Sequence, residues 1–232
     1  NNDGDVSMAL AAERTVEKVL VIVVTSDRGL CGGYNSNLIK LTKQVIKDKY
    51  PDQHSKGNVQ VLTIGKKAYE HFTKNNFKVV DQFWNIFTGL SFEKVQEAAQ
   101  YAMDAFANKE IDAVELVFSE FKNAATQQFI AEPFLPVQKI SNNQSGIKAD
   151  FIYEPGKEIL IAELIPKILN TQLYKAVLDG NASEHGARMT AMDKASDNAN
   201  ELLKSLKISY NRARQAAITT ELTEIVSGAA AL

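Results

Sequence analysis

A glycine-rich loop that contains the only cysteine, Asp27 to Gly33, is the part of the sequence whose residue types could do chemistry. It follows an apolar run directly, and in nucleotide-binding folds the backbone amides of such a loop hold phosphate at a helix N-terminus. Here the glycines are Gly29, Gly32 and Gly33, a spacing that matches neither the dinucleotide fingerprint nor the P-loop. The loop is therefore predicted to be a tight turn between a strand and a helix, with no bound cofactor.

Catalytic and metal-binding residues are not indicated elsewhere. A nucleophilic cysteine needs a nearby base, and the three histidines are scattered and lie in no recognisable catalytic motif: His54, His71 and His185. No pair of His, Cys, Asp or Glu residues has convincing metal-ligand spacing. We therefore expect no catalytic residue, no metal and no cofactor.

The elements that would position this loop alternate between strand and helix. The apolar run at 19–24 is β-branched at every position except Leu20, which is typical of a strand covered on both faces. Two proline residues, Pro133 and Pro136, indicate an edge hairpin over 121–137. Further strands are expected at 59–64, 77–80, 113–118 and 151–153, a polar turn at 51–58, and helices at 35–49, 66–74 and 91–108. The pattern predicts an α/β fold with a Rossmann-like, mostly parallel sheet.

The last third of the chain has a different pattern. We divide the sequence into a polar lead at 1–17, an α/β domain at 18–158 and a helical region at 159–232. Ser183 is expected to cap a long helix over about 183–227. Such a helix would span about 68 Å, more than a domain of this size can cover, so it should project. Its apolar residues recur at steps of three and four, the seam of a coiled coil: Met192, Ala195, Ala199, Leu202, Leu206, Tyr210, Ala213 and Ala217.

Composition and charge exclude several classes of function. Hydrophobic residues make up 45% and charged residues 23% of the chain, the balance of a protein that buries a core. The net charge of −2 gives no field that would attract nucleic acid, and no apolar run is long enough to span a membrane. The charges between Leu202 and Thr220 are all basic, a run that suits either a solvated face or a partner surface: Lys204, Lys207, Arg212 and Arg214.

Three stretches resemble the gamma subunit family of F-type ATP synthases. They are 25–37 (TSDRGLCGGYNSN), 183–192 (SEHGARMTAM) and 210–232, the last long and without gaps, and the resemblance covers about 18–232. The resemblance implies a shaft in which an N-terminal and a C-terminal helix pair as an antiparallel coiled coil inside a ring of alpha and beta subunits. It also implies that the α/β domain is a foot against the epsilon subunit and the membrane c-ring. Such a subunit couples ion-driven rotation of the c-ring to ATP synthesis or hydrolysis and does no chemistry itself.

The resemblance further implies contact residues. A catch contact with the beta subunit would use Arg214, Gln215 and Thr219, whose guanidinium, amide and hydroxyl groups suit carboxylates and other polar partners. A beta-facing loop would use Asp27, Arg28 and Cys31, and a basic collar Lys204, Lys207 and Arg212. The foot would approach the c-ring and epsilon through Phe151, Tyr153 and Glu154.

The chain also departs from the family pattern. The family's N-terminal helix has no counterpart among these 232 residues, which begin with Asn1 rather than methionine, so we expect a processed or truncated chain whose seam lacks its usual partner. Gly186 stands where the family usually has alanine. Because no cysteine-bearing insertion of the plastid type is present, a bacterial form is expected, peripheral on the cytoplasmic face of the inner (plasma) membrane.

Two other functions remain open from the sequence. One is a Rossmann-type nucleotide-binding enzyme with a helical oligomerisation arm, which the loop after the first strand would serve. The other is a coiled-coil adaptor that dimerises through 183–227. Nucleotide binding would favour the first, and self-association without other subunits the second.

Overall fold

The computed structural model describes residues 10–12, 14–124, 126–137 and 157–231. The chain divides into two compact units, Asn1–Met189 and Thr190–Leu232. We treat each unit by itself.

A five-stranded sheet forms the centre of the first unit, with the strand order β3-β2-β1-β4-β5. The four strands β1 (Val19–Val24), β2 (Val59–Ile64), β3 (Lys78–Val80) and β4 (Ala113–Phe121) are parallel. The edge strand β5 (Gln127–Leu135) pairs antiparallel with β4, as the expected hairpin requires. The predicted fold class, a mostly parallel Rossmann-like sheet, is thus confirmed.

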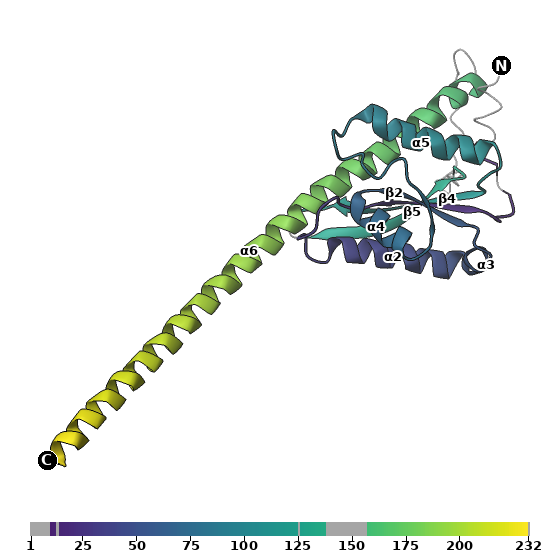
Figure 1. Ribbon diagram of the computed structural model, residues 1–232. Helices are drawn as coiled ribbons and strands as arrows, with labels where there is room; N and C mark the ends of the chain where they lie inside the picture. Colours follow the sequence, from purple (N-terminus) through teal and green to yellow (C-terminus); the bar gives the residue numbers. More distant parts are fainter. Residues whose placement is uncertain (1–9, 13, 125, 138–156, 232) are drawn as a thin grey trace, which may run out of the picture. The chain divides into compact units, whose positions relative to one another are not determined.

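Helices cover both faces of the sheet because β1 is apolar at every position. One face is packed by α2 (Tyr34–Lys49) and α4 (Lys66–Lys74), which bury their apolar residues against alternate β1 valines. The other face is packed by α5 (Phe92–Ala107) and by α6 (Lys157–Ala230), whose early residues join the larger core. Figure 1 shows α5 and the green part of α6 on one side of the sheet and α2 on the other. A short helix, α3 (Pro51–Ser55), occupies the expected polar turn.

The long helix begins earlier than the sequence suggested. α6 has 74 residues and starts at Lys157 rather than at Ser183, and Pro166 lies inside it. Ser183 does not cap the helix, since its side chain is fully buried and its hydroxyl donates to the backbone oxygen of Ser119 at 3.3 Å. The helix continues through the proline because neighbouring residues, among them Leu169 and Leu173, are buried in the core. Packing therefore outweighs local propensity.

The polar lead contains more structure than its composition indicated. Leu10 is fully buried in the larger core, and its backbone oxygen accepts from the Val137 amide at 3.1 Å. The Arg14 guanidinium lies 4.2 Å from the centre of the Phe106 ring and pairs with Asp112 at 3.3 Å. These contacts tie residues 10–17 to the domain. The strand expected at 151–153 lies outside the described residues.

Candidate partner-binding surfaces

The second unit consists of the C-terminal part of α6, and its side chains are open to solvent. Every described residue from Met192 to Ala231 is exposed, including those of the predicted seam. Leu202 is 61% exposed, Leu206 58% and Tyr210 68%. A run of large apolar side chains of this length marks a surface that a partner covers.

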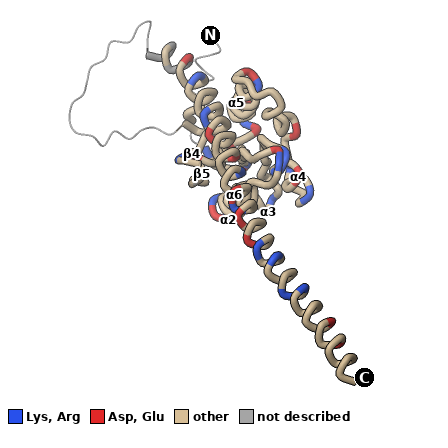
Figure 2. The backbone as a smooth tube through the Cα atoms, turned by 90° about the vertical axis from the view of Figure 1, so that its left-hand side faces the viewer, with Lys and Arg blue, Asp and Glu red and all other residues tan. Residues whose placement is uncertain are grey.

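The apolar seam residues and the basic residues lie on different sides of this helix. At about 100° of rotation per residue, the eight seam residues fall within about 80° of arc. The same count places Lys204 and Arg212 on the side facing away from the seam, and Lys207 and Arg214 on one flank. Figure 2 shows blue bands along the C-terminal part of α6 and red bands nearer the C-terminus. One helix thus carries an apolar stripe for one partner and a basic surface for another.

The three residues assigned to a catch contact lie next to this basic surface. Gln215 and Thr219 are one turn apart, and the Thr219 hydroxyl donates to the Gln215 backbone oxygen at 2.8 Å. All three side chains, Arg214 included, are exposed. By the rotation count, Gln215 and Thr219 share the outward side of the helix with Lys204 and Arg212. The structure therefore brings the catch residues and the collar residues onto one stretch of exposed helix.

The loop after β1 is held from within. The Ser26 amide donates to Asn35 Oδ1 at 3.0 Å, so Asn35 fixes the loop from the first turn of α2. Cys31 is only 2% exposed, and Asn35 Nδ2 donates to its sulfur at 3.2 Å. This burial contradicts the assignment of Cys31 to a contact surface.

The exposed tip of the loop includes a residue that sequence reasoning missed. Asp27 is half-buried and Arg28 is exposed, and Leu30 is 77% exposed with a φ of 63°. A left-handed conformation is uncommon for leucine and costs about 1–2 kcal/mol. An apolar side chain held outward in a strained conformation is a stronger contact candidate than the buried thiol. Only the surrounding fold shows this, because the sequence pattern does not reveal φ.

The helix N-terminus beside this loop has no amide left for a phosphate. The first four amides of α4 are all bonded within the protein: Lys66 N to Asp27 Oδ1 at 3.0 Å, Lys67 N to Ser26 O at 3.1 Å, Ala68 N to Thr25 Oγ1 at 3.0 Å and Tyr69 N to Gly65 O at 3.4 Å. Anion sites at helix N-termini depend on unbonded amides. The loop therefore caps α4, which disfavours an anion at the N-terminus of that helix.

A cleft of about 570 Å³ lies between the loop and α6 within the first unit. Its charged lining has both signs, since Arg28 and Arg188 face Asp27 and Glu184. Arg188 donates to the backbone oxygens of Arg28 at 3.4 Å and Gly29 at 3.3 Å and pairs with Glu184 at 2.7 Å. The arginine is thus engaged with the loop and with its own helix.

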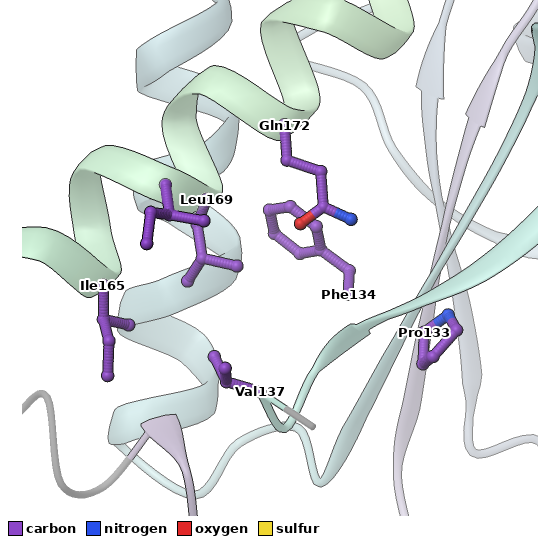
Figure 3. A pocket seen from close by; sticks show the side chains of 7 residues that line it. Pro133, Phe134, Val137, Ile165, Leu169 and Gln172 are labelled. Atoms are coloured by element: carbon purple, nitrogen blue, oxygen red, sulfur yellow. The ribbon is translucent and has the colours of Figure 1, made fainter. Parts of the chain in front are cut away.

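A second cleft, of about 220 Å³, lies between β5 and the early part of α6. Figure 3 shows Ile165 and Leu169 of α6 pointing toward Val137 and Phe134, with the Gln172 amide at one side. No group in this lining could act as an acid, base or metal ligand. The cleft is an apolar joint between a strand and a helix.

The described residues offer little that could support catalysis. In that part of the chain, no group of three or more His, Cys, Asp and Glu residues could hold a metal ion. No helix described here is long and apolar enough to cross a membrane. The proposed foot residues, Phe151, Tyr153 and Glu154, lie outside the described residues.

An α/β domain joined to a long helix that exposes an apolar seam and a basic surface defines a subunit of a larger assembly. A family model described as ATP synthase matches residues 1–232. The ATP synthase gamma chain of Cytophaga hutchinsonii is 48% identical over 225 residues, covering 96% of this chain and 76% of the relative. The gamma chain of Chlorobium phaeobacteroides is 44% identical over 232 residues, covering 99% and 79%. The chain belongs to the ATP synthase gamma-chain family, which provides the central-stalk subunit of the rotary enzyme.

Solved structures share the fold at lower identity. A chain of the Euglena gracilis mitochondrial ATP synthase, in a structure of its OSCP, F1 and c-ring parts, matches with a TM-score of 0.65 and 21% identity, covering 96% of this chain and 78% of its own. A chain of the Tetrahymena thermophila mitochondrial ATP synthase, from its central stalk and c-ring, matches with a TM-score of 0.57 and 20% identity, covering 82% and 81%.

Proposed function

We propose that this chain is a rotor that couples ion-driven rotation of a c-ring to ATP synthesis or hydrolysis in a ring of alpha and beta subunits, and does no chemistry itself. The observation that carries the proposal is the exposed part of α6, with its seam and its separate basic surface. A shaft inside a ring needs both, because the seam binds a second shaft helix while the other side meets the ring. The gamma chains named above support these partners, with the epsilon subunit and the c-ring at the foot.

The contact residues follow the same division. Arg214, Gln215 and Thr219 form the catch with carboxylates and polar groups of beta, and Lys204, Lys207 and Arg212 extend it as a basic collar. Planar guanidinium groups bind carboxylates through paired hydrogen bonds, which gives orientation as well as attraction. The beta-facing loop contributes Asp27 and Arg28, to which we add Leu30 in place of the buried Cys31. Phe151, Tyr153 and Glu154 remain the proposed foot contacts.

The absence of chemistry in this subunit is supported by two features of the loop region. The α4 amides that could hold phosphate are bonded to Asp27, Ser26, Thr25 and Gly65, and the only thiol is buried. The subunit would be peripheral, on the cytoplasmic face of a bacterial inner membrane, and its 48% and 44% identity to the gamma chains of two bacteria supports a bacterial form.

The catch is tested with the double variant Arg214→Ala, Gln215→Ala in the assembled complex. Loss of the charged Arg214 contact alone removes about 1.5–3 kcal/mol, so ATP-driven rotation should slow by about tenfold or more. Asn211→Ala is the matched control, because it removes an exposed polar side chain from the same helix outside the proposed contacts. Unchanged assembly, hydrolysis and ion pumping in the double variant would refute the catch assignment.

The nucleotide-binding alternative predicts a different result. Calorimetric titration of the chain with ATP, NAD and NADP should give no binding heat if the chain is a rotor. Tight binding that is lost when Gly32 and Gly33 are changed would instead support an enzyme. Sedimentation of the chain with and without alpha and beta subunits tests the adaptor alternative, which predicts a stable dimer of this chain alone.

A further inference from the structure

The sheet has a topological switch point between β1 and β4, since the chain runs from β1 to β2 on one side and returns to β4 on the other. Open α/β sheets bind their ligands in the crevice beyond the carboxyl ends of the strands at this point. Here β1 ends at Val24, and Ser119 lies near the end of β4. The place where a related fold would hold a nucleotide is therefore defined by these two strand ends.

In this protein α6 packs against both strand ends. A Cβ added to Gly180 would lie 2.9 Å from Val24 Cγ1, closer than real Cβ atoms approach. The Tyr34 hydroxyl donates to the Gly180 backbone oxygen at 2.8 Å, and the Ser183 hydroxyl donates to the Ser119 backbone oxygen at 3.3 Å. All five residues are buried. The helix thus meets the strand ends at two small buried residues, with a hydrogen bond at each.

These contacts with the strand ends fit only one rotational setting of α6. A shift by one residue turns an α-helix by about 100°, so it would bring Asp179 or Asn181 to the place of Gly180. Neither side chain fits where a single Cβ already meets Val24. The same shift would withdraw Leu173, Ala176 and Val177 from the core that they fill. The packing of α6 in the core and its hydrogen bonds to Tyr34 and Ser119 therefore both oppose rotation of the helix.

We propose that the seat formed by Val24, Tyr34, Ser119, Gly180 and Ser183 is the rotational lock through which torque passes between the α/β domain and α6. The inference rests on the proposed rotor function. Force applied to the domain reaches the helix through the contacts that fix its angle, and these five residues supply two hydrogen bonds and one close approach among those contacts. A weakened lock lets the helix slip when the opposing load is high.

The lock is tested by Gly180→Ala in the assembled complex in sealed vesicles. The substitution favours helix formation but places a methyl group against Val24. The largest ion gradient that ATP hydrolysis can build, here called the stall gradient, should therefore be lower in this variant while hydrolysis continues. Adding Val24→Ala removes the methyl group that the new one meets and should restore the stall gradient. Ala182→Gly is the control, because it weakens the same turn of helix at an exposed position and should leave the stall gradient unchanged.

Tyr34→Phe provides a second test that adds no bulk. Loss of the hydroxyl bond should raise local opening, and thus amide hydrogen exchange over 176–187, by about fivefold, which corresponds to about 1 kcal/mol. If Gly180→Ala does not assemble, the stall gradient of Tyr34→Phe tests the lock by itself. It should also be lower than that of the parent complex. An unchanged stall gradient in the assembled variants would overturn the lock. A parent complex that hydrolyses ATP but never pumps would instead overturn the rotor function.

Discussion

Alkaline pH should weaken the fold through Tyr34, the buried tyrosine that binds α6. Its hydroxyl donates to the Gly180 backbone oxygen at 2.8 Å, a bond that a phenolate cannot make. Burial is the main cause that raises the pKa of the Tyr34 phenol well above its ordinary value, with the negative charges of Glu184 and Cys31 as further causes. The folded protein therefore keeps this phenol protonated at pH values where the unfolded chain loses the proton.

The linkage between protonation and folding gives the sign and the size of the change in the free energy of unfolding with pH. Because the folded pKa lies above the unfolded value of about 10, the stabilisation is complete below pH 10 and falls as the pH rises further. By about pH 11 the parent should have lost about 1.4 kcal/mol through this group relative to pH 8. Tyr34→Phe lacks the titration but also lacks the hydrogen bond, which is worth about 1 kcal/mol. The variant should thus be less stable than the parent at about pH 8, and the two should become nearly equal by about pH 11.

Urea unfolding at several pH values measures this difference, and tyrosinate absorbance follows the titration directly. Tyr50 also has a raised pKa, caused first by burial and then by Glu115, but it is present in both proteins and cancels from the comparison. Tyr210→Phe is the matched control, because this tyrosine is 68% exposed and its removal should give no pH-dependent difference. A gap between parent and Tyr34→Phe that stays constant from pH 8 to pH 11 would show that the reasoning is wrong.

Two further substitutions test the packing of the α/β domain. Glu115 is a buried carboxylate that accepts from Lys49 Nζ at 2.9 Å and from the Tyr50 hydroxyl at 2.9 Å, so Glu115→Ala should lower the free energy of unfolding by about 2–3 kcal/mol. Urea denaturation measures this, and a loss below about 0.5 kcal/mol would mean that the buried charge has no net value. Ser91 caps α5 through a long bond of 3.5 Å from the Lys94 amide, so Ser91→Ala should cost about 0.5 kcal/mol in the same assay. Ser91→Asp should restore the loss, and a failure to do so would contradict the capping role.

Much of the sheet could be predicted because its signals are local. The β-branched runs at Val19–Val24 and Val59–Ile64 form strands with the expected bounds, and α4 also has its expected bounds. Ser91 caps α5 as expected, since a serine before an amphipathic run needs no distant partner to do so. The edge position of β5 followed from Pro133 within it and Pro136 just after it, since proline cannot donate to a central ladder.

Other features depend on contacts between residues far apart in the sequence, and they could not be predicted. Ser183 resembles a helix cap, but its partner is the Ser119 backbone oxygen across the core. Pro166 resembles a helix boundary, but the packing of α6 against the sheet carries the helix through it. Gly186 stands where the family usually has alanine, and a Cβ there would lie 3.0 Å from the Ala124 backbone oxygen, so glycine fits the position without a close contact. The burial of Cys31 likewise depends on Asn35 and Ser26.

The loop that first suggested nucleotide binding explains why the fold can serve mechanically instead. Its Asp27 and Thr25 bond the α4 amides that a phosphate would need, and the helix that follows it supplies Tyr34 to the Gly180 backbone oxygen. The residues that close the anion site therefore lie within ten positions of the residue that seats α6. In open α/β sheets the crevice at the switch point is where ligands bind, and here α6 packs against the two strand ends that border it. A long helix that packs there gains a fixed angular setting from these contacts.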